Sequence, residues 1–426
     1  MNFVEELKWR GVLQDVMPGT EELLNKEMVS AYIGFDPSAD SLHVGSLVQI
    51  MTLLRFQKCG HKPIALVGGA TGLIGDPSGK KEERKLLSEE DVQHNVNSIK
   101  KQLEKFLDFN NGANAAELVN NNDWFKEIKT IEFMRDAGKY LTVSYLLNKG
   151  FIKDRLVQNQ DISFTEFNYI LMQAYDFYWL YQNKNCKLQM GGSDQWGNIT
   201  AGTELIRKKI QKDAFGITCK LLVKADGGKF GKSESGNIWL DKNRTSPYKF
   251  YQFWLNSSDE DAKNYIRIFS MLSQKEIEQI EKLHFTAPHE RHLQKTLAKE
   301  VTIRVHSEND FNSAVEASEI LFKGSIEDLT KLNESVFLDV FDGVPQFNIS
   351  KNELTSGIGV LDFLAEKTNI FPSKGEARKM LQAGGVSFNK QKWEDEKASV
   401  TMQNTINQKY ILVQKGKKNY FLCLIK

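Results

Sequence analysis

Short apolar runs alternate with amphipathic stretches between about residues 28 and 225. Residues 64–67 and 187–190 are two such runs, and each lies between segments with helical spacing of apolar residues. Glycine-rich turns follow both, at 68–72 and 191–193. Strands that alternate with helices form parallel α/β sheets, whose ligands bind beyond the carboxyl ends of the strands. The pattern therefore predicts a parallel sheet with its ligand site at these turns.

The pattern changes in the second half of the chain. Residues 245–322 have the spacing of amphipathic helices, which predicts a helical bundle. Residues 323–352 are mixed and rich in turn formers, so we expect a linker there. Residues 353–426 return to two helical patterns followed by strand-like runs. The expected domains are therefore 1–244, 245–322 and 353–426, with the linker before the last.

A histidine lies where one of the expected helices begins. Residues 41–50 have the pattern of a turn that opens a helix, after a strand-like stretch at 30–36. Backbone amides at a helix start bind phosphates. His43, with Gly45 two positions later, is therefore placed where the phosphates of a nucleotide would dock.

Two lysines occur much later, in Lys229-Phe230-Gly231-Lys232-Ser233. Neither segment is specific alone, because short matches arise by chance and lysine-rich runs are commonly solvated loops. Activation of a carboxylate by ATP needs positioning and donors aimed at the charge that develops on phosphorus oxygens. Together, the histidine and lysine segments resemble the two nucleotide-handling motifs of class I aminoacyl-tRNA synthetases.

One predicted helix carries a polar stripe. Tyr169, Gln173 and Asp176 are spaced four and three residues apart, so they share a helix face. The apolar residues of the same helix, 164–181, fall on the opposite side, where they can anchor it in a core. An ordinary solvent-exposed polar face is the alternative. Residues 191–198, dense in small and polar groups at a predicted strand-to-helix turn, favour a binding pocket.

Five segments in order along the chain resemble bacterial-type tyrosyl-tRNA synthetases. They are 32–43, 75–80, 163–167, 191–198 and 229–233. The resemblance implies an α/β fold with a Rossmann-like parallel-sheet catalytic domain, a helical anticodon-binding domain and a small α+β C-terminal RNA-binding domain. It also implies the reaction: L-tyrosine and ATP, accompanied by Mg²⁺, form tyrosyl-adenylate and pyrophosphate. The tyrosyl group then passes to the terminal adenosine of tRNA(Tyr), for protein biosynthesis.

The resemblance further implies residue roles. Tyr32 and Asp176 would bind the phenol hydroxyl of the substrate, while Asp76, Tyr169 and Gln173 would bind its ammonium group. Phenylalanine would leave the hydroxyl-binding groups unpaired, which disfavours it. The other implied positions are Gly34 and Gln195 for tyrosine, then Asp36, Ser38, His43, Gly45, Ser46, Gly192, Asp194, Lys229 and Lys232 for ATP, and finally His43, Lys80, Arg84, Lys229, Lys232 and Ser233 for catalysis.

Two stretches need comment. The resemblance assigns Lys80 and Arg84 to a loop that closes in the transition state, although a solvated surface turn is the alternative. Many family members carry a second histidine where this chain has Ser46. A serine donates a hydrogen bond but brings no charge, which puts the strength of pyrophosphate-side stabilisation in question. Phe230-Gly231 stands where other class I enzymes have Met-Ser, and we interpret it as the tyrosyl version.

The C-terminal segment 371–386 is similar to an RNA-binding module first known from a small-subunit ribosomal protein. Lys374, Arg378 and Lys379 would line one helical face that tracks RNA phosphates. Charge runs are commonly only solvated faces, but the helix-turn-helix pattern favours RNA. The family forms a two-fold dimer, so we expect a homodimer. The apolar stretch from Trp124 to Met134 is either its contact or internal core.

Composition sets outer limits. A chain of 426 residues is expected to form two or three domains. Its 56 Lys and Arg balance 55 Asp and Glu, so RNA contacts must come from local patches. The four cysteines lie far apart without metal-ligand spacing, which predicts buried thiols in a reducing compartment. The N-terminus is unlike a targeting peptide, and no long apolar run predicts a membrane span. We expect a cytoplasmic enzyme.

Two competing interpretations stay open. Tryptophanyl-tRNA synthetase shares the scaffold, although Tyr32, Asp176 and the C-terminal module favour tyrosine. A non-catalytic RNA-binding protein could also keep the scaffold, and Ser46 is the feature that allows it. The residues His43, Asp194, Lys229 and Lys232 argue against that second interpretation, because a chain released from catalysis has no physical need for them.

Overall fold

The computed structural model describes residues 2–77, 87–228, 230–233, 236–323, 326–332, 334–342, 344–416 and 419–426. They form two compact units, of which the first combines Met1–Thr245 with Gln252–His306 and the second combines Ser246–Tyr251 with Ser307–Lys426. The domain boundaries expected from the sequence stay a prediction.

Six strands make the central sheet of the first unit, in the order β1-β6-β5-β2-β3-β4. They are β1 (Leu13–Val16), β2 (Ser30–Phe35), β3 (Lys62–Val67), β4 (Glu117–Asn120), β5 (Cys186–Gly192) and β6 (Phe215–Cys219). All neighbours pair in parallel except β1, which is antiparallel to β6. The predicted parallel α/β sheet is confirmed.

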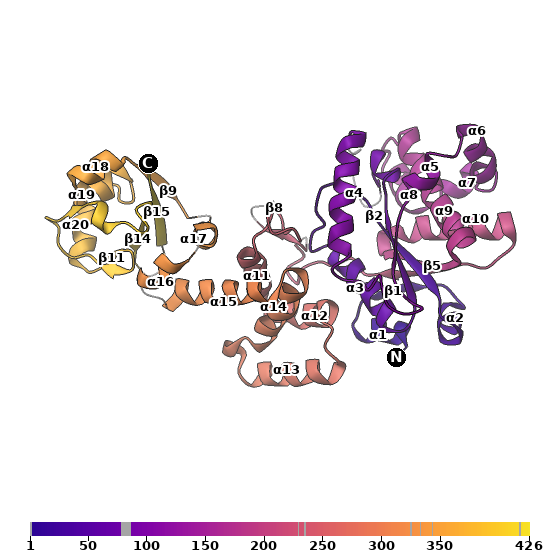
Figure 1. Cartoon of the computed structure of the whole chain (residues 1–426), viewed down its shortest axis with the longest axis horizontal. Coiled ribbons are helices and arrows are strands. Elements are labelled where there is room, and N and C mark those ends of the chain that lie inside the picture. The colour runs from indigo at the N-terminus through magenta and orange to yellow at the C-terminus, as the bar shows by residue number, and fades with distance from the viewer. Residues whose placement is uncertain are drawn as a thin grey trace. The chain divides into compact units, whose positions relative to one another are not determined.

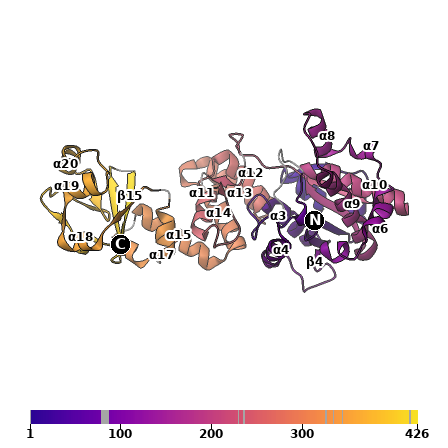
Figure 2. The same ribbon diagram turned by 90° about the horizontal axis from the view of Figure 1, so that it is seen from above.

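Helices cover both faces of this sheet. Figure 1 and Figure 2 show α3 (Leu47–Lys58) and α4 (Glu89–Leu103) on one side, with α9 (Phe164–Lys184) and α10 (Trp196–Ile210) on the other. From the central pair β2 and β5, the strand order runs to β3 in one direction and to β6 in the other. Such a reversal of winding is a topological switch point, where the crossovers part and leave a crevice for a ligand.

The long helix α9 follows its local sequence signals. Ser163 and Glu166 form a capping box at its start, and Asn185 ends it in a left-handed conformation with φ of 49°. Leu171, Ala174 and Phe177 are buried on its apolar side. The predicted helix over 164–181 is confirmed.

Shorter elements complete the first unit. Around the sheet lie α1 (Phe3–Trp9), α2 (Thr20–Lys26), α5 (Asn122–Phe125), α6 (Thr130–Phe133), α7 (Val143–Leu146), α8 (Gly150–Val157), the π-helix Met134–Gly138 and the 3-10 helices Thr71–Leu73 and Ser193–Gln195. The pair β7 (Lys232–Ser233) and β8 (Gly236–Asn237) precedes α11 (Pro247–Leu255), whose residues up to Tyr251 belong to the second unit. The first unit continues with α12 (Asp259–Phe269), α13 (Gln274–Thr286), the 3-10 helix Pro288–Glu290 and α14 (His292–Val305). The helical character predicted for this region is confirmed.

A five-stranded sheet of order β12-β11-β14-β15-β9 organises the second unit. Its strands are β9 (Gln346–Ile349), β11 (Val386–Phe388), β12 (Gln391–Lys392), β14 (Tyr410–Lys415) and β15 (Asn419–Ile425). The other elements are α15 (Glu308–Lys323), α16 (Ile326–Lys331), α17 (Glu334–Val340), α18 (Lys351–Ser356), α19 (Val360–Asp362), the π-helix Phe363–Lys367, α20 (Lys374–Gln382), the 3-10 helix Met402–Asn404 and the pair β10 (Ile358–Gly359) and β13 (Ser399–Val400).

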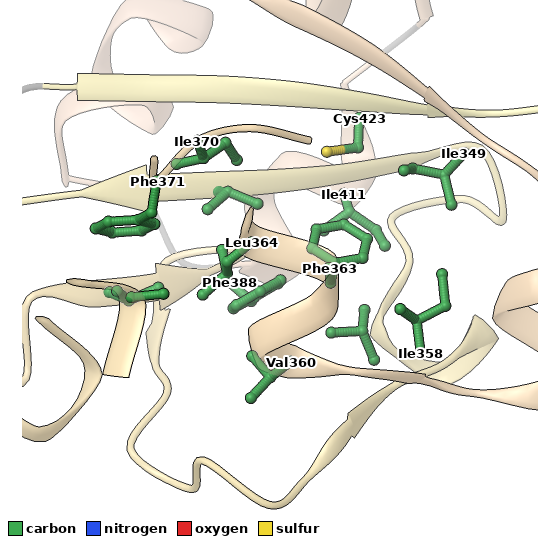
Figure 3. Packing of buried hydrophobic residues seen from close by; sticks show 14 of the residues in the cluster. Ile349, Ile358, Val360, Phe363, Leu364, Ile370, Phe371, Phe388, Ile411 and Cys423 are labelled. Atoms are coloured by element: carbon green, nitrogen blue, oxygen red, sulfur yellow. The ribbon is translucent and has the colours of Figure 1, made fainter. Parts of the chain in front are cut away.

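The core of the second unit joins this sheet to its helices. Figure 3 shows Ile349, Phe363 and Ile411 gathered in one cluster, and all three are buried. Ile349 belongs to β9, which pairs in parallel with β15. The segment 323–352, expected as a linker, therefore contributes a strand to the sheet and a side chain to the core.

Two further observations concern the described residues. Their helices include none that is both long and apolar enough to span a membrane. Cys186, Cys219 and Cys423 are buried free thiols, as predicted, while Cys59 is half-buried.

Candidate active site

A cavity of about 270 Å³ opens at the carboxyl ends of β2 and β5, at the switch point of the sheet. The predicted site residues that line it are Tyr32, Gly34, Asp36, Ser38, His43, Ser46, Asp76, Tyr169, Gln173, Asp176, Gly192, Asp194 and Gln195. They come from segments far apart in the chain, so the fold gathers the predicted residues into one place.

Strand alternation places three of these residues. Tyr32, Gly34 and Asp36 are two positions apart along and just beyond β2, so they face the same side of the sheet. A Cβ added to Gly34 would meet only Leu66, at 3.8 Å. The glycine therefore leaves the middle of the cavity wall open for a ligand.

A buried carboxyl group lies at the end of the cavity that Tyr32 lines. Asp176 is 2% exposed, and its two oxygens accept hydrogen bonds from Asn121 Nδ2 at 3.1 Å and Trp124 Nε1 at 2.9 Å. Burial raises the pKa of Asp176 to about 8, although both hydrogen bonds act to lower it. The carboxyl is thus oriented but poorly solvated, and a further donor would stabilise its charged form.

The hydroxyl of Tyr32 is the second polar group at that end. Tyr32 is 1% exposed, and its hydroxyl has no hydrogen-bond partner among the described residues. Burial, and next the charge of Asp176, raise its pKa well above the ordinary value. A buried hydroxyl without a partner is costly, so this geometry suits a ligand that carries a hydroxyl of its own.

The polar end of the cavity is a hydrogen-bonded network. Gln195 Nε2 donates to Asp76 Oδ2 at 2.8 Å, and Gln173 Nε2 donates to Gln195 Oε1 at 3.2 Å. The hydroxyl of Tyr169 donates to Asp36 Oδ2 at 2.9 Å. Burial and the charges of Asp36 and Asp76 raise the pKa of Tyr169, so its hydroxyl keeps its proton. Carboxylates and carbonyl oxygens fixed in this way suit a cationic group.

The two nucleotide motifs meet in the structure. The backbone amide of Gly45 donates to His43 Nδ1 at 3.0 Å, which makes Nε2 the protonated nitrogen of a neutral ring. A Cβ on Gly45 would lie 2.6 Å from Cε1 of that ring. Gly231, with φ of 79°, packs so closely that its Cβ would lie 2.9 Å from Val44 Cγ2. Gly231 of the lysine motif therefore packs directly against Val44 of the histidine motif.

Several predicted catalytic side chains cannot be placed. Lys80, Arg84 and Lys229 lie outside the described residues. Lys232 and Ser233 are described only through their backbone, which pairs with β8. Ser46 is half-buried at the start of α3, and its side chain makes no capping hydrogen bond.

Sequence reasoning missed Asn121 as a site residue and left the place of Trp124 open. Both hold Asp176, and Trp124 is 6% exposed, which assigns it to the core instead of to a subunit contact. It also missed Gln189, which lines the cavity, is 2% exposed and has no described partner for Oε1. Gln189 pairs opposite Tyr32 across β2 and β5. The sequence does not reveal this register, so it could not have identified Gln189 as a site residue.

The predicted RNA-binding residues lie together in the second unit, on α20. Lys374 pairs with Asp362 and with Glu366, and Arg378 pairs with Glu396 at 3.2 Å. Lys379 is exposed and has no ion-pair partner within 4.0 Å among the described residues. The basic face is thus partly neutralised by neighbouring carboxylates.

Comparison with known proteins identifies the family of this chain. Residues 24–323 match the model of the family "tRNA synthetases class I (W and Y)", and residues 337–423 match the "Tyrosine--tRNA ligase SYY-like C-terminal domain". The tyrosine--tRNA ligase of Bacteroides thetaiotaomicron is 59% identical over 430 residues and covers 100% of both chains. The chain belongs to the bacterial tyrosine--tRNA ligase family.

Two solved structures are similar to this chain to different degrees. A C-terminally truncated mitochondrial tyrosyl-tRNA synthetase of Aspergillus nidulans matches with a TM-score of 0.68 and 30% identity, over 75% of this chain and 94% of that one. The tryptophanyl-tRNA synthetase of Plasmodium falciparum matches with a TM-score of 0.52 at 14% identity, over 79% and 88% of the two chains. That likeness shows the shared fold alone. The predicted family, fold class and enzyme class, an aminoacyl-tRNA ligase, are confirmed.

Proposed function

We propose that this chain activates L-tyrosine with ATP and transfers it to tRNA(Tyr), with substrate tyrosine held between Tyr32 and Asp176. The unpaired hydroxyl of Tyr32 beside the Asp176 carboxyl carries this proposal. A tyrosine phenol can donate to the carboxylate and accept from Tyr32, which satisfies both groups. Phenylalanine satisfies neither, and an indole offers a donor but no acceptor.

The network at the polar end supports the orientation of the substrate. Asp76, Gln173 and Tyr169 would receive the ammonium group, so the tyrosine carboxylate would point toward Gln195 and the nucleotide. In that orientation the carboxylate attacks the α-phosphorus, and no protein nucleophile is needed. Positioning of the two substrates then supplies much of the rate.

ATP would bind across the same switch point. Gly192 leaves room for the Asp194 carboxylate beside the cavity, because a Cβ there would lie 2.5 Å from Asp194 Oδ1. Asp36 and Asp194 would bind the ribose, and Ser38, His43, Gly45 and Ser46 would reach the phosphates. The neutral His43 would donate from Nε2, while Lys229 and Lys232, with Lys80, Arg84 and Ser233, would neutralise the charge on pyrophosphate. Mg²⁺ would accompany ATP on its phosphate oxygens.

The remaining substrate and the assembly are also part of the proposal. Lys374, Arg378 and Lys379 would contact tRNA phosphates, because they share one short helix. A homodimer would cover some of the exposed apolar residues of the first unit, namely Ile131, Met134, Val143, Val157 and Phe164. A patch of this kind on a soluble domain marks an interaction surface. The enzyme would act in the cytoplasm, where tRNA and ribosomes are found.

ATP–pyrophosphate exchange with tyrosine, phenylalanine and tryptophan tests the function. We expect exchange with tyrosine alone, and its loss in Asp176→Ala. Exchange with tryptophan alone would assign the chain to the sibling activity. No exchange with any of the three, together with retained tRNA binding, would favour a non-catalytic RNA-binding protein.

A further inference from the structure

The loop that leads into the lysine motif is fastened to α12 at two points. The backbone amide of Ala225 donates to Asp261 Oδ1 at 2.9 Å, in the first turn of the helix. The ring of Phe230 stacks on Phe269 at the other end of α12, with centroids 5.5 Å apart and planes 14° from parallel. The helix therefore holds the loop at Ala225, where the turn begins, and at Phe230, beyond it.

The seat of Phe230 is an aromatic cluster. Besides Phe269, its ring lies 5.0 Å from Tyr265, 6.0 Å from Phe253 and 6.0 Å from Trp254, measured between centroids. Trp254 and Phe269 are fully buried. Aromatic pairs of this kind contribute beyond their buried area, so the ring is held in a defined position.

The helix α12 is also connected, through α3, to the histidine motif. Arg55, 2% exposed on α3, donates to the backbone oxygen of Ser270 at 2.9 Å, just past the end of α12. Arg10 donates to the backbone oxygen of Leu272 at 2.8 Å. Guanidinium groups at the end of a helix satisfy its unpaired carbonyls and stabilise its dipole. Because α3 begins directly after Ser46, one rigid helix links α12 to the histidine motif.

The same loop also contacts the histidine motif directly. Gly231 lies against Val44, as its 2.9 Å Cβ contact indicates, and the amide of Ile238 donates to the Gly231 oxygen at 3.0 Å. The amide of Val44 donates to the Ile238 oxygen at 2.9 Å. Together with α3 and α12, these contacts form a closed series of packed groups that includes the histidine motif, Gly231 and Phe230.

We infer that Phe230 is a positioning residue for adenylate formation: α12 fixes its ring, and the ring sets the place of Gly231 and of the backbone that follows it relative to His43. The inference rests on the proposed function, because it needs the phosphates to lie between the two motifs. Phe230 is not among the described residues that line the cavity. Its loss would shift the donors that meet the transition state, and a displacement of about 1 Å can cost about 100-fold in rate.

The test separates rate from binding in the full-length protein. We expect Phe230→Ala to lower the single-turnover rate of tyrosyl-adenylate formation about 100-fold, with tyrosine affinity measured at equilibrium unchanged. Phe230→Leu, which keeps an apolar side chain but no ring, should fall between Phe230→Ala and wild type. A partly restored rate in Phe230→Leu would support positioning and would also show that the fold is intact.

Two control variants on α13 distinguish positioning from stability. Phe285→Ala removes a phenylalanine that is 85% exposed and should leave the rate unchanged. Ile277→Ala opens a cavity at a fully buried position and should lower the melting temperature without a matching loss of rate. Wild-type rates in Phe230→Ala, or a parallel loss of tyrosine affinity, would overturn the inference. Absence of tyrosine-dependent exchange in the wild type would instead refute the proposed function.

Discussion

The indole of Trp124 donates a hydrogen bond of 2.9 Å to Asp176 Oδ1, so a core residue orients the carboxyl that faces the substrate cavity. Asn121 binds the other oxygen at 3.1 Å. Both donors come from the segment after β4, more than fifty residues from Asp176 in sequence (separations of 52 and 55). Under the proposed function, selectivity for a phenol would therefore depend on two donors, Asn121 and Trp124, that do not line the cavity.

Trp124→Phe tests this dependence. Phenylalanine keeps an aromatic ring at this position but has no N–H donor. One of the two donors that stabilise the charged carboxyl is therefore lost, so the pKa of Asp176 should rise further. We expect tyrosine affinity to fall about tenfold or more, as for a hydrogen bond to a charged group. Equilibrium titration with tyrosine measures it. Trp9→Phe, at a residue that does not line the cavity, is the matched control and should bind as wild type.

The titration of Asp176 makes tyrosine binding depend on pH. Its raised pKa of about 8 means that the carboxyl of the free enzyme is mostly protonated at pH 6. The ionised form accepts a hydrogen bond from the phenol. While the pH is below the pKa, the fraction of ionised carboxyl increases about tenfold for each unit by which the pH rises. Tyrosine affinity should therefore increase from pH 6 to pH 8 and level off above it.

Isothermal titration across that range measures the dependence. Asp176→Asn cannot ionise, so its weaker binding should be flat with pH, apart from any titration of tyrosine itself. A wild-type affinity that does not change between pH 6 and 8 would contradict the role assigned to the charged carboxyl.

Tyr32→Phe should separate function from stability. The hydroxyl of Tyr32 has no partner in the described part of the free protein, so its removal relieves an unsatisfied buried group. We expect the melting temperature without ligand to stay equal or rise, while the increase on adding tyrosine becomes smaller. Tyr145→Phe is the control, because its hydroxyl donates to the Thr200 oxygen at 3.1 Å. That variant should lower the melting temperature and leave the tyrosine-induced increase intact.

The parts of the site that local periodicity controls were predictable. Tyr169, Gln173 and Asp176 share a face of α9 because helical spacing requires it, and the capping box at Ser163 begins that helix where the sequence indicates. The strand that carries Tyr32 and the helix start near His43 follow from patterns within ten or so residues. In these cases sequence neighbours decide the geometry.

Partners brought together by the sheet could not be predicted. Asn121 and Trp124 reach Asp176 only because β4 and α9 pack in one unit, and Gln189 faces the cavity because of the β2–β5 register. The segment 323–352, expected as a linker, also contains an element that depends on a distant partner in the sequence. Its short strand β9 is too weak a local signal, and it becomes a strand by pairing with β15.

Gly45→Ala should impair adenylate formation by moving His43. The added Cβ would lie 2.6 Å from the imidazole, which must turn away and lose its bond to the Gly45 amide. We expect a 10- to 100-fold lower single-turnover rate, by the roughly 100-fold effect of a 1 Å misplacement, with unchanged tyrosine affinity. Gly375→Ala, where a Cβ would meet only Ser373 at 3.9 Å, is the control. Equal rates in the two variants would show that adenylate formation does not depend on the orientation of His43.

The basic face of α20 should contribute to tRNA binding according to how its charges are paired. Lys379 has no described ion-pair partner, whereas Arg378 is neutralised by Glu396 at 3.2 Å. Each phosphate contact that is lost reduces the salt dependence of binding by about one unit of slope in log K against log salt. Lys379→Ala should show that reduction and weaker binding, and Arg378→Ala a smaller change. Filter binding of tRNA at several salt concentrations measures both slopes.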